Sequence, residues 1–117
     1  MRLPTLAVLA PLIPLAAADK LVTTVICLPS LCSYINGWWY TGYGSYWALG
    51  TDGCHGADQN GVPGLQDYCL DFSRSRGHFY FTNQPKRCLN VVSWEPIENT
   101  PTQTTSLMTW EEVACTW

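Results

Sequence analysis

Basic and aromatic residues gather in one short stretch of this chain, where they could bind a phosphate. Four of its six basic residues lie within fourteen positions: Arg74, Arg76, Lys86 and Arg87. His78 stands between them, next to the aromatic run 79–81. Cationic side chains position a phosphate backbone and aromatic rings stack on bases, which are the ingredients of nucleic-acid binding. Phosphodiester cleavage needs an acid, a base and a cation around one phosphate, so the enzymatic alternative is a small ribonuclease-like hydrolase using His78 and a glutamate.

The rest of the composition disfavours both uses. The formal net charge is −3, and four cations are few for an affinity driven by counterion release. Phe79 and Phe81 alternate as core residues of a strand do, and His55 stands in a glycine-rich loop pattern. No G-x-S-x-G, H-E-x-x-H or phosphate-loop motif is present, so we assign no catalytic residue and favour binding over catalysis.

A second group of residues could bind a partner by stacking. Six large rings fall within ten positions: Trp38, Trp39, Tyr40, Tyr43, Tyr46 and Trp47. Alternation places residues 39, 41 and 43 on one face and residues 38 and 40 on the other, so one set is expected to fill the core. Exposed tryptophan and tyrosine rings stack on sugars or anchor a protein partner. The binding candidates are therefore Trp38, Trp39, Tyr43 and Trp47 together with Arg74, Arg76, His78, Lys86 and Arg87, and we expect them to form one surface.

The cysteines predict covalent cross-links rather than a metal site. All six, Cys27, Cys32, Cys54, Cys69, Cys88 and Cys115, follow residue 19, and an even number in a short exported chain predicts three disulfides, with the pairing left open. Their spacing lacks the C-x-x-C pairs of structural zinc sites. Segment 56–61 resembles the middle of a calcium loop but lacks the acidic first ligand. We expect neither a metal nor a cofactor.

The first eighteen residues read as a secretory signal peptide. A basic start at Arg2 is followed by an uncharged stretch of 16 residues that ends in three alanines before Asp19, so we predict cleavage after Ala18. That stretch is shorter than the roughly 20 apolar residues that span a bilayer, and three prolines interrupt it. The expected product is one exported domain, residues 19–117, with no membrane partner.

The elements that must position these side chains are mostly strands. Four segments have strand or hairpin patterns: 20–27, 38–47 with a turn at 41–44, 66–72, and 77–92 with a turn near 82–85. Five glycines predict a long loop over 50–64, and the prolines and threonines of 95–106 predict a flexible connection. Glu111 and Glu112 could begin one short helix. The predicted fold is mainly β: a small disulfide-stabilised antiparallel domain of the sandwich or barrel kind.

Together these features resemble a known class. The predicted leader, the short mature chain, the spaced cysteines, the many aromatics and the runs GTDGCHG and RGHFYF…KRCL are similar to the small secreted cysteine-rich proteins of filamentous fungi, many of them candidate effectors. The resemblance implies a virulence factor that binds a host protein or a cell-wall polysaccharide, outside the producing cell or after transfer into the host. It implies no catalytic residue and leaves the oligomeric state open.

Overall fold

The structure, a computed structural model, describes residues 18–117. The predicted signal peptide lies outside this range except for its last residue, Ala18. The regular structure of the described part is almost entirely strand, with almost no helix. Its elements in chain order are β1 Lys20–Leu28, β2 Leu31–Thr41, β3 Gly44–Leu49, β4 Gly53–His55, the 3₁₀ turn η1 Ala57–Gln59, β5 Leu65–Asp71, the 3₁₀ turn η2 Phe72–Arg74, β6 Arg76–Phe81, β7 Arg87–Thr100 and β8 Gln103–Val113.

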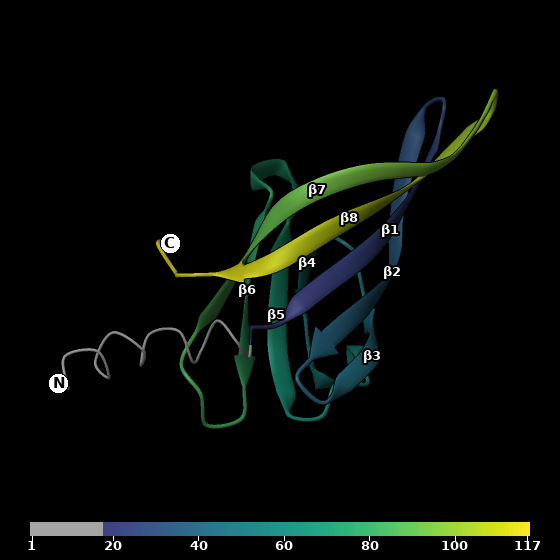
Figure 1. The fold of residues 1–117 in the computed structure, drawn as a ribbon. Coiled ribbons are helices and arrows are strands. Elements are labelled where there is room, and N and C mark those ends of the chain that lie inside the picture. The colour runs from purple at the N-terminus through teal and green to yellow at the C-terminus, as the bar shows by residue number, and fades with distance from the viewer. Residues whose placement is uncertain (1–17) are drawn as a thin grey trace, which may run out of the picture.

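The strands form one antiparallel sheet in the order β3-β2-β1-β8-β7-β6-β5-β4. Its two edges approach each other, because Ala48 of β3 makes a bridge with Asn60 and the Gly61 amide donates a 2.8 Å hydrogen bond to the Trp47 carbonyl. The Tyr68 hydroxyl of β5 also donates to the Leu49 carbonyl at 2.7 Å. The sheet is therefore a nearly closed barrel (Figure 1), which confirms the predicted fold class.

Aromatic side chains fill the barrel. Trp39 is fully buried, and its ring is edge-on to those of Tyr68 and Phe79, with centroids 5.5 and 5.0 Å away. The equally buried Trp110 donates its indole N–H to the Thr23 hydroxyl at 3.0 Å. These rings come from inward positions of four different strands, so they fix the strands relative to one another.

Most of the predicted strands are confirmed. β1 covers the segment 20–27, β5 covers most of 66–72, and β6 pairs with β7 as the predicted hairpin. The aromatic segment 38–47 folds back on itself with Thr41 paired to Gly44, as expected. The loop over 50–64 is less irregular than predicted, because it contains the short strand β4, which pairs with β5.

Segment 95–106 was wrongly predicted as a flexible connection. It forms the far ends of β7 and β8, joined by a tight turn after Thr100. Beyond Asn90, β7 no longer pairs with β6, so Pro96 lies on a sheet edge where its missing N–H leaves no ladder bond unmade. In Figure 1 this hairpin and the β1–β2 hairpin project from the same end of the barrel.

The prediction that Glu111 and Glu112 begin a short helix is also wrong. Both residues belong to β8, where they pair with Asn90 and Leu89. In the described part the helical pieces are the two 3₁₀ turns, each of three residues. No helix within residues 18–117 is long and apolar enough to cross a membrane.

Three disulfides are present, as predicted, and they join cysteines that are consecutive in sequence. Cys27–Cys32 closes the tip of the β1–β2 hairpin, and Cys54–Cys69 links β4 to β5. Cys88–Cys115 attaches the residues after β8 to the outside of β7. Each bridge thus lies within a hairpin or between neighbouring parts of the sheet.

Candidate functional site

Three large rings on β2 and β3 face out of the barrel. Trp38 is paired directly with Trp47, and Tyr40 lies two residues further along the same face of β2. Their exposed fractions are 50%, 40% and 40%, respectively. We call Trp38, Tyr40 and Trp47 the aromatic surface. Because paired strands carry all three residues, the backbone beneath the rings is fixed before any ligand arrives.

Polar groups border the aromatic surface. The Trp47 indole N–H points to the Asn36 side-chain oxygen at 3.5 Å, and the Lys20 ammonium lies 5.2 Å from the centre of the Tyr40 ring. A depression of about 460 Å³ is lined by Tyr40 together with Ala18, Asp19, Lys20, Thr41, Glu111 and Glu112. The surface therefore combines planar apolar rings with hydrogen-bonding groups at both of its ends, Asn36 near Trp47 and Lys20 near Tyr40.

Two other aromatic candidates lie elsewhere. Trp39 is fully buried and donates its indole N–H to the Asp19 carboxylate at 2.8 Å, so it is a core residue and not part of a binding surface. Tyr43 is 96% exposed because it stands in the turn after Thr41, where the strand alternation that pairs it with Trp39 has ended. It could contact a ligand but is not held beside the other rings.

Arg74, Arg76 and His78 share one cavity on the outside of β5 and β6. The cavity measures about 390 Å³, and its wall also includes Asp52, Asp71 and Trp117. The Arg76 guanidinium lies 4.9 Å from the centre of the Trp117 ring. Partial burial and, secondarily, the positive charge of Lys86 hold the pKa of His78 below its ordinary value. We call this the basic cavity.

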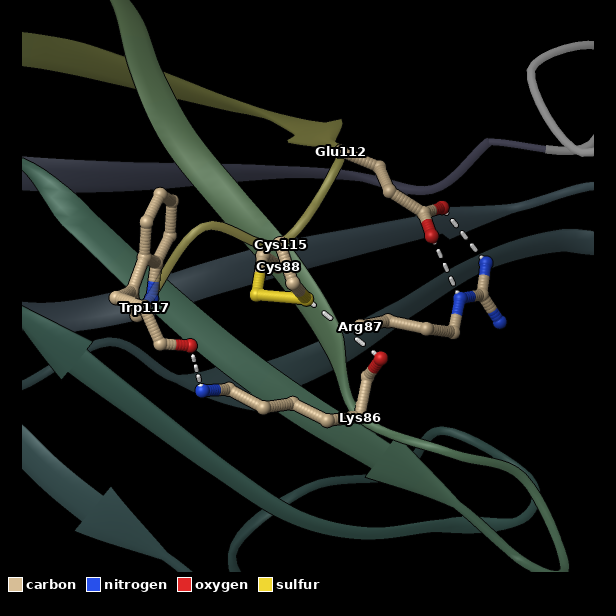
Figure 2. Close-up of a disulfide and its surroundings, with 6 residues drawn as sticks. All are labelled: Lys86, Arg87, Cys88, Glu112, Cys115 and Trp117. Carbon is tan, nitrogen blue, oxygen red and sulfur yellow. Dashed lines mark hydrogen bonds and ion pairs between the residues drawn. A yellow bond between two sulfur atoms is a disulfide. The ribbon is translucent and has the colours of Figure 1, made fainter.

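Lys86 and Arg87 do not extend the basic cavity into a cationic strip, as Figure 2 shows. The Lys86 ammonium donates to the Trp117 carbonyl, whereas Arg87 points toward Glu112 of β8. The Arg87 side chain lies over the buried Phe79, 4.9 Å from its ring centre, inside one end of the barrel. Neighbouring residues of an extended chain point to opposite faces, so this basic pair could not serve one surface.

Arg87 belongs to an ion cluster that the sequence analysis missed. Its Nε and Nη2 donate to the two Glu112 carboxylate oxygens, both at 2.7 Å, and its Nη2 lies 3.4 Å from an Asp19 oxygen. We call Asp19, Arg87 and Glu112 the ion cluster. The hydrogen bonds to Glu112 raise the pKa of Arg87, while burial raises the pKa of Asp19 despite the opposing effects of Trp39 and Arg87. One feature of the sequence could have indicated this cluster. Glu112 continues the inward-facing alternation of Met108 and Trp110 on β8, and an acidic residue at such a position needs a cationic partner.

The two predicted halves of the binding surface are not brought together. In the sheet order β1, β8 and β7 separate β2 from β6, and on the other side β3, β4 and β5 separate them. In a nearly closed barrel this arrangement places the aromatic surface and the basic cavity on opposite sides. They are two separate candidate sites.

Comparison with known proteins adds no assignment to either site. No protein-family model, curated protein or solved structure matches the chain. Among residues 18–117, no group of three or more histidine, cysteine, aspartate or glutamate side chains is arranged to hold a metal ion. A function must therefore be argued from the geometry of the two surfaces.

Proposed function

We propose that this protein is a secreted interaction protein of the effector type that binds cell-wall polysaccharide through its aromatic surface. The observation that carries the proposal is the directly paired Trp38 and Trp47, which a rigid sheet holds half exposed. Water disfavours exposed apolar area, and large rings gathered in one exposed patch commonly mark a recognition site. Tryptophan offers a flat face on which the C–H groups of a sugar ring can stack.

The layout of the surface favours an extended ligand over a small one. Directly paired residues lie about 5 Å apart, and residues i and i+2 of one strand about 7 Å apart. Trp38, Trp47 and Tyr40 therefore offer neighbouring stacking positions along and across the strands. Lys20, Thr41 and Glu111 at the margin could hydrogen-bond the sugar hydroxyls.

The three disulfides support the proposal that the protein works outside the producing cell. Three disulfides in a chain this small are typical of proteins that work in an oxidising environment. Under the proposal the protein is a virulence factor that contacts the wall of a host.

The test is retention on insoluble polysaccharides. We expect the wild-type protein to be pulled down by at least one of cellulose, chitin, β-1,3-glucan and xylan. Trp38→Ala should weaken that binding by roughly 30-fold, which corresponds to the ~2 kcal/mol of a well-placed aromatic anchor. Trp47→Ala should act similarly, because its ring is the direct cross-strand partner of Trp38.

Trp94→Ala is the matched control. Trp94 is also 50% exposed but lies on β7, with β1 and β8 between it and β2, so its loss should leave retention unchanged. If no polysaccharide retains the wild-type protein, or if Trp94→Ala weakens binding as much as Trp38→Ala, the glycan proposal is wrong. A protein ligand for the same rings would then be sought by crosslinking.

The basic cavity supports a second candidate, a ribonuclease-like hydrolase. Two arginines that could hold a phosphate lie in it beside His78, whose lowered pKa suits a general base at neutral pH. The partner carboxylate would have to be Asp52 or Asp71, not a glutamate, because Glu112 binds Arg87 at the barrel end. Both aspartates already accept local hydrogen bonds, which makes this the weaker candidate.

An RNA cleavage assay tests the ribonuclease-like function. We expect any activity to fall at least a hundredfold in His78→Ala, and to fall in the wild type as the pH drops through the lowered pKa of His78. His55→Ala is the control, since that ring lies outside the cavity, against Tyr68 and hydrogen-bonded to Thr51. Absence of cleavage by the wild-type protein would end the candidate.

A further inference from the structure

The ion cluster holds more negative than positive charge. Two carboxylates, Asp19 and Glu112, face a single guanidinium, that of Arg87. The Asp19 side chain is 5% exposed and that of Glu112 17%, so water screens neither fully. An uncompensated charge in such a place is strongly unfavourable. The arrangement has room for one more positive group.

The position for that group is the backbone nitrogen of Asp19. This nitrogen donates to Glu112 Oε1 at 3.0 Å, the same oxygen that accepts from Arg87 Nη2. The Asp19 carbonyl in turn accepts from the Glu112 amide at 3.1 Å, which fixes residue 19 against β8. While Ala18 is attached, the nitrogen is a neutral amide; as a chain terminus it would be an ammonium group in contact with a carboxylate.

The sequence predicts cleavage between Ala18 and Asp19. We propose that the α-ammonium group freed on Asp19 by this cleavage completes the ion cluster by pairing with Glu112. An endopeptidase that cuts after small residues would catalyse the step. Hydrolysis adds one water: the C–N bond breaks, the water oxygen remains on the Ala18 carboxylate, and the Asp19 nitrogen takes up both protons of the water to become an –NH3⁺ group. Cleavage thereby balances two buried negative charges with two positive ones.

The surroundings favour the protonated amine. The charged groups around it are the carboxylates of Asp19, Glu111 and Glu112 and the cations of Lys20 and Arg87, with the Tyr40 hydroxyl nearby. Burial alone would lower the pKa of the α-amine, but the Glu112 carboxylate in direct contact raises it and acids outnumber bases around it, so we expect this pKa to lie above its ordinary value of about 7.7–8.0. The stabilisation is then complete below that ordinary pKa and is lost as the pH rises through the raised one.

The experiment begins with the full chain expressed in a secreting eukaryotic host. The intact mass of the secreted protein should show Asp19 as its first residue. At pH 7, acylation of the α-amine should be at least tenfold slower in the folded protein than in urea, because each unit of raised pKa removes a factor of ten of free amine. In Glu112→Gln the folded protein should acylate at least tenfold faster than wild type.

A second variant keeps the test valid if Glu112→Gln does not fold properly. One glycine inserted between Ala18 and Asp19 moves the ammonium group away and leaves Arg87 and Glu112 unchanged. We expect its Tm at pH 7 to be lower by ~4 °C or more, and the difference to disappear by pH 10, where the wild-type amine is neutral. A different first residue, equal acylation of the folded and unfolded protein, or a Tm difference unaffected by pH would each overturn the proposal.

Discussion

Arg87→Met is expected to lower the free energy of unfolding by about 3–5 kcal/mol, the usual cost of removing one partner from a buried ion pair. The substitution leaves the carboxylates of Asp19 and Glu112 facing each other without the guanidinium that both contact. It also removes the cation from the faces of Phe79 and Phe81. Urea denaturation at pH 7 measures the change.

Arg74→Met is the matched control. Arg74 is 67% exposed and lies 3.8 Å from Asp71, a pair on the surface that should contribute less than about 1 kcal/mol. If the two variants lose equal stability, the ion cluster is not a stabilising element.

The Arg87→Met variant should also respond to pH in a defined direction. Burial and the neighbouring Glu112 already raise the pKa of Asp19, and removing Arg87 raises it further. A carboxyl whose pKa is raised in the folded state loses stability as the pH rises through that pKa. The variant should therefore regain stability relative to wild type as the pH falls from 7 toward the raised pKa of Asp19, and a constant difference would contradict this account.

The second large effect is expected from Cys88→Ala combined with Cys115→Ala. This disulfide closes a separation of 27 residues, for which the chain-entropy model gives about 3.5 kcal/mol. It also holds the last residues against the barrel, where Trp117 contacts Arg76 and Lys86. Urea denaturation of the double variant against the oxidised wild type measures the loss.

Cys27→Ala combined with Cys32→Ala provides the comparison. That bridge spans a separation of 5 residues, and the same model gives about 2 kcal/mol. It lies at a projecting hairpin tip between exposed leucines, and its partly buried cysteines touch only the margin of the core, so the loop-closure effect should dominate its loss. A larger loss here than for Cys88–Cys115 would mean that the chain end is not anchored as the structure places it.

Local patterns in the sequence were enough to predict most strands, because a barrel buries one face of each strand. The alternation correctly places Trp38 and Trp39 on opposite faces, although it did not identify Trp39 as the ring that faces the core. The hairpin over 95–106 could not be predicted in the same way, since proline and threonine are common both in loops and in edge strands. The segment forms a hairpin because β7 continues to pair with β8 after Asn90, where its pairing with β6 ends.

The candidate sites were harder to predict because they depend on which strands become neighbours. Arg76 and Arg87 are eleven positions apart, yet one faces out of the barrel and the other into its end. The Asp19–Glu112 contact spans 93 positions and exists only because β1 pairs with β8. Neither arrangement follows from the spacing of the residues alone.

The order of the strands has a consequence for how the chain is made. Every neighbouring pair in the sheet is consecutive in sequence except β1 and β8. Under the proposed secretion, a chain that crosses a membrane from its N-terminus can form one meander from β1 to β3 and another from β4 to β8, and can oxidise each cysteine pair as its second member emerges. Closure between β1 and β8 must wait for the last strand. Until then β1 exposes an unpaired edge, which makes this interval the period when the chain most needs protection from aggregation.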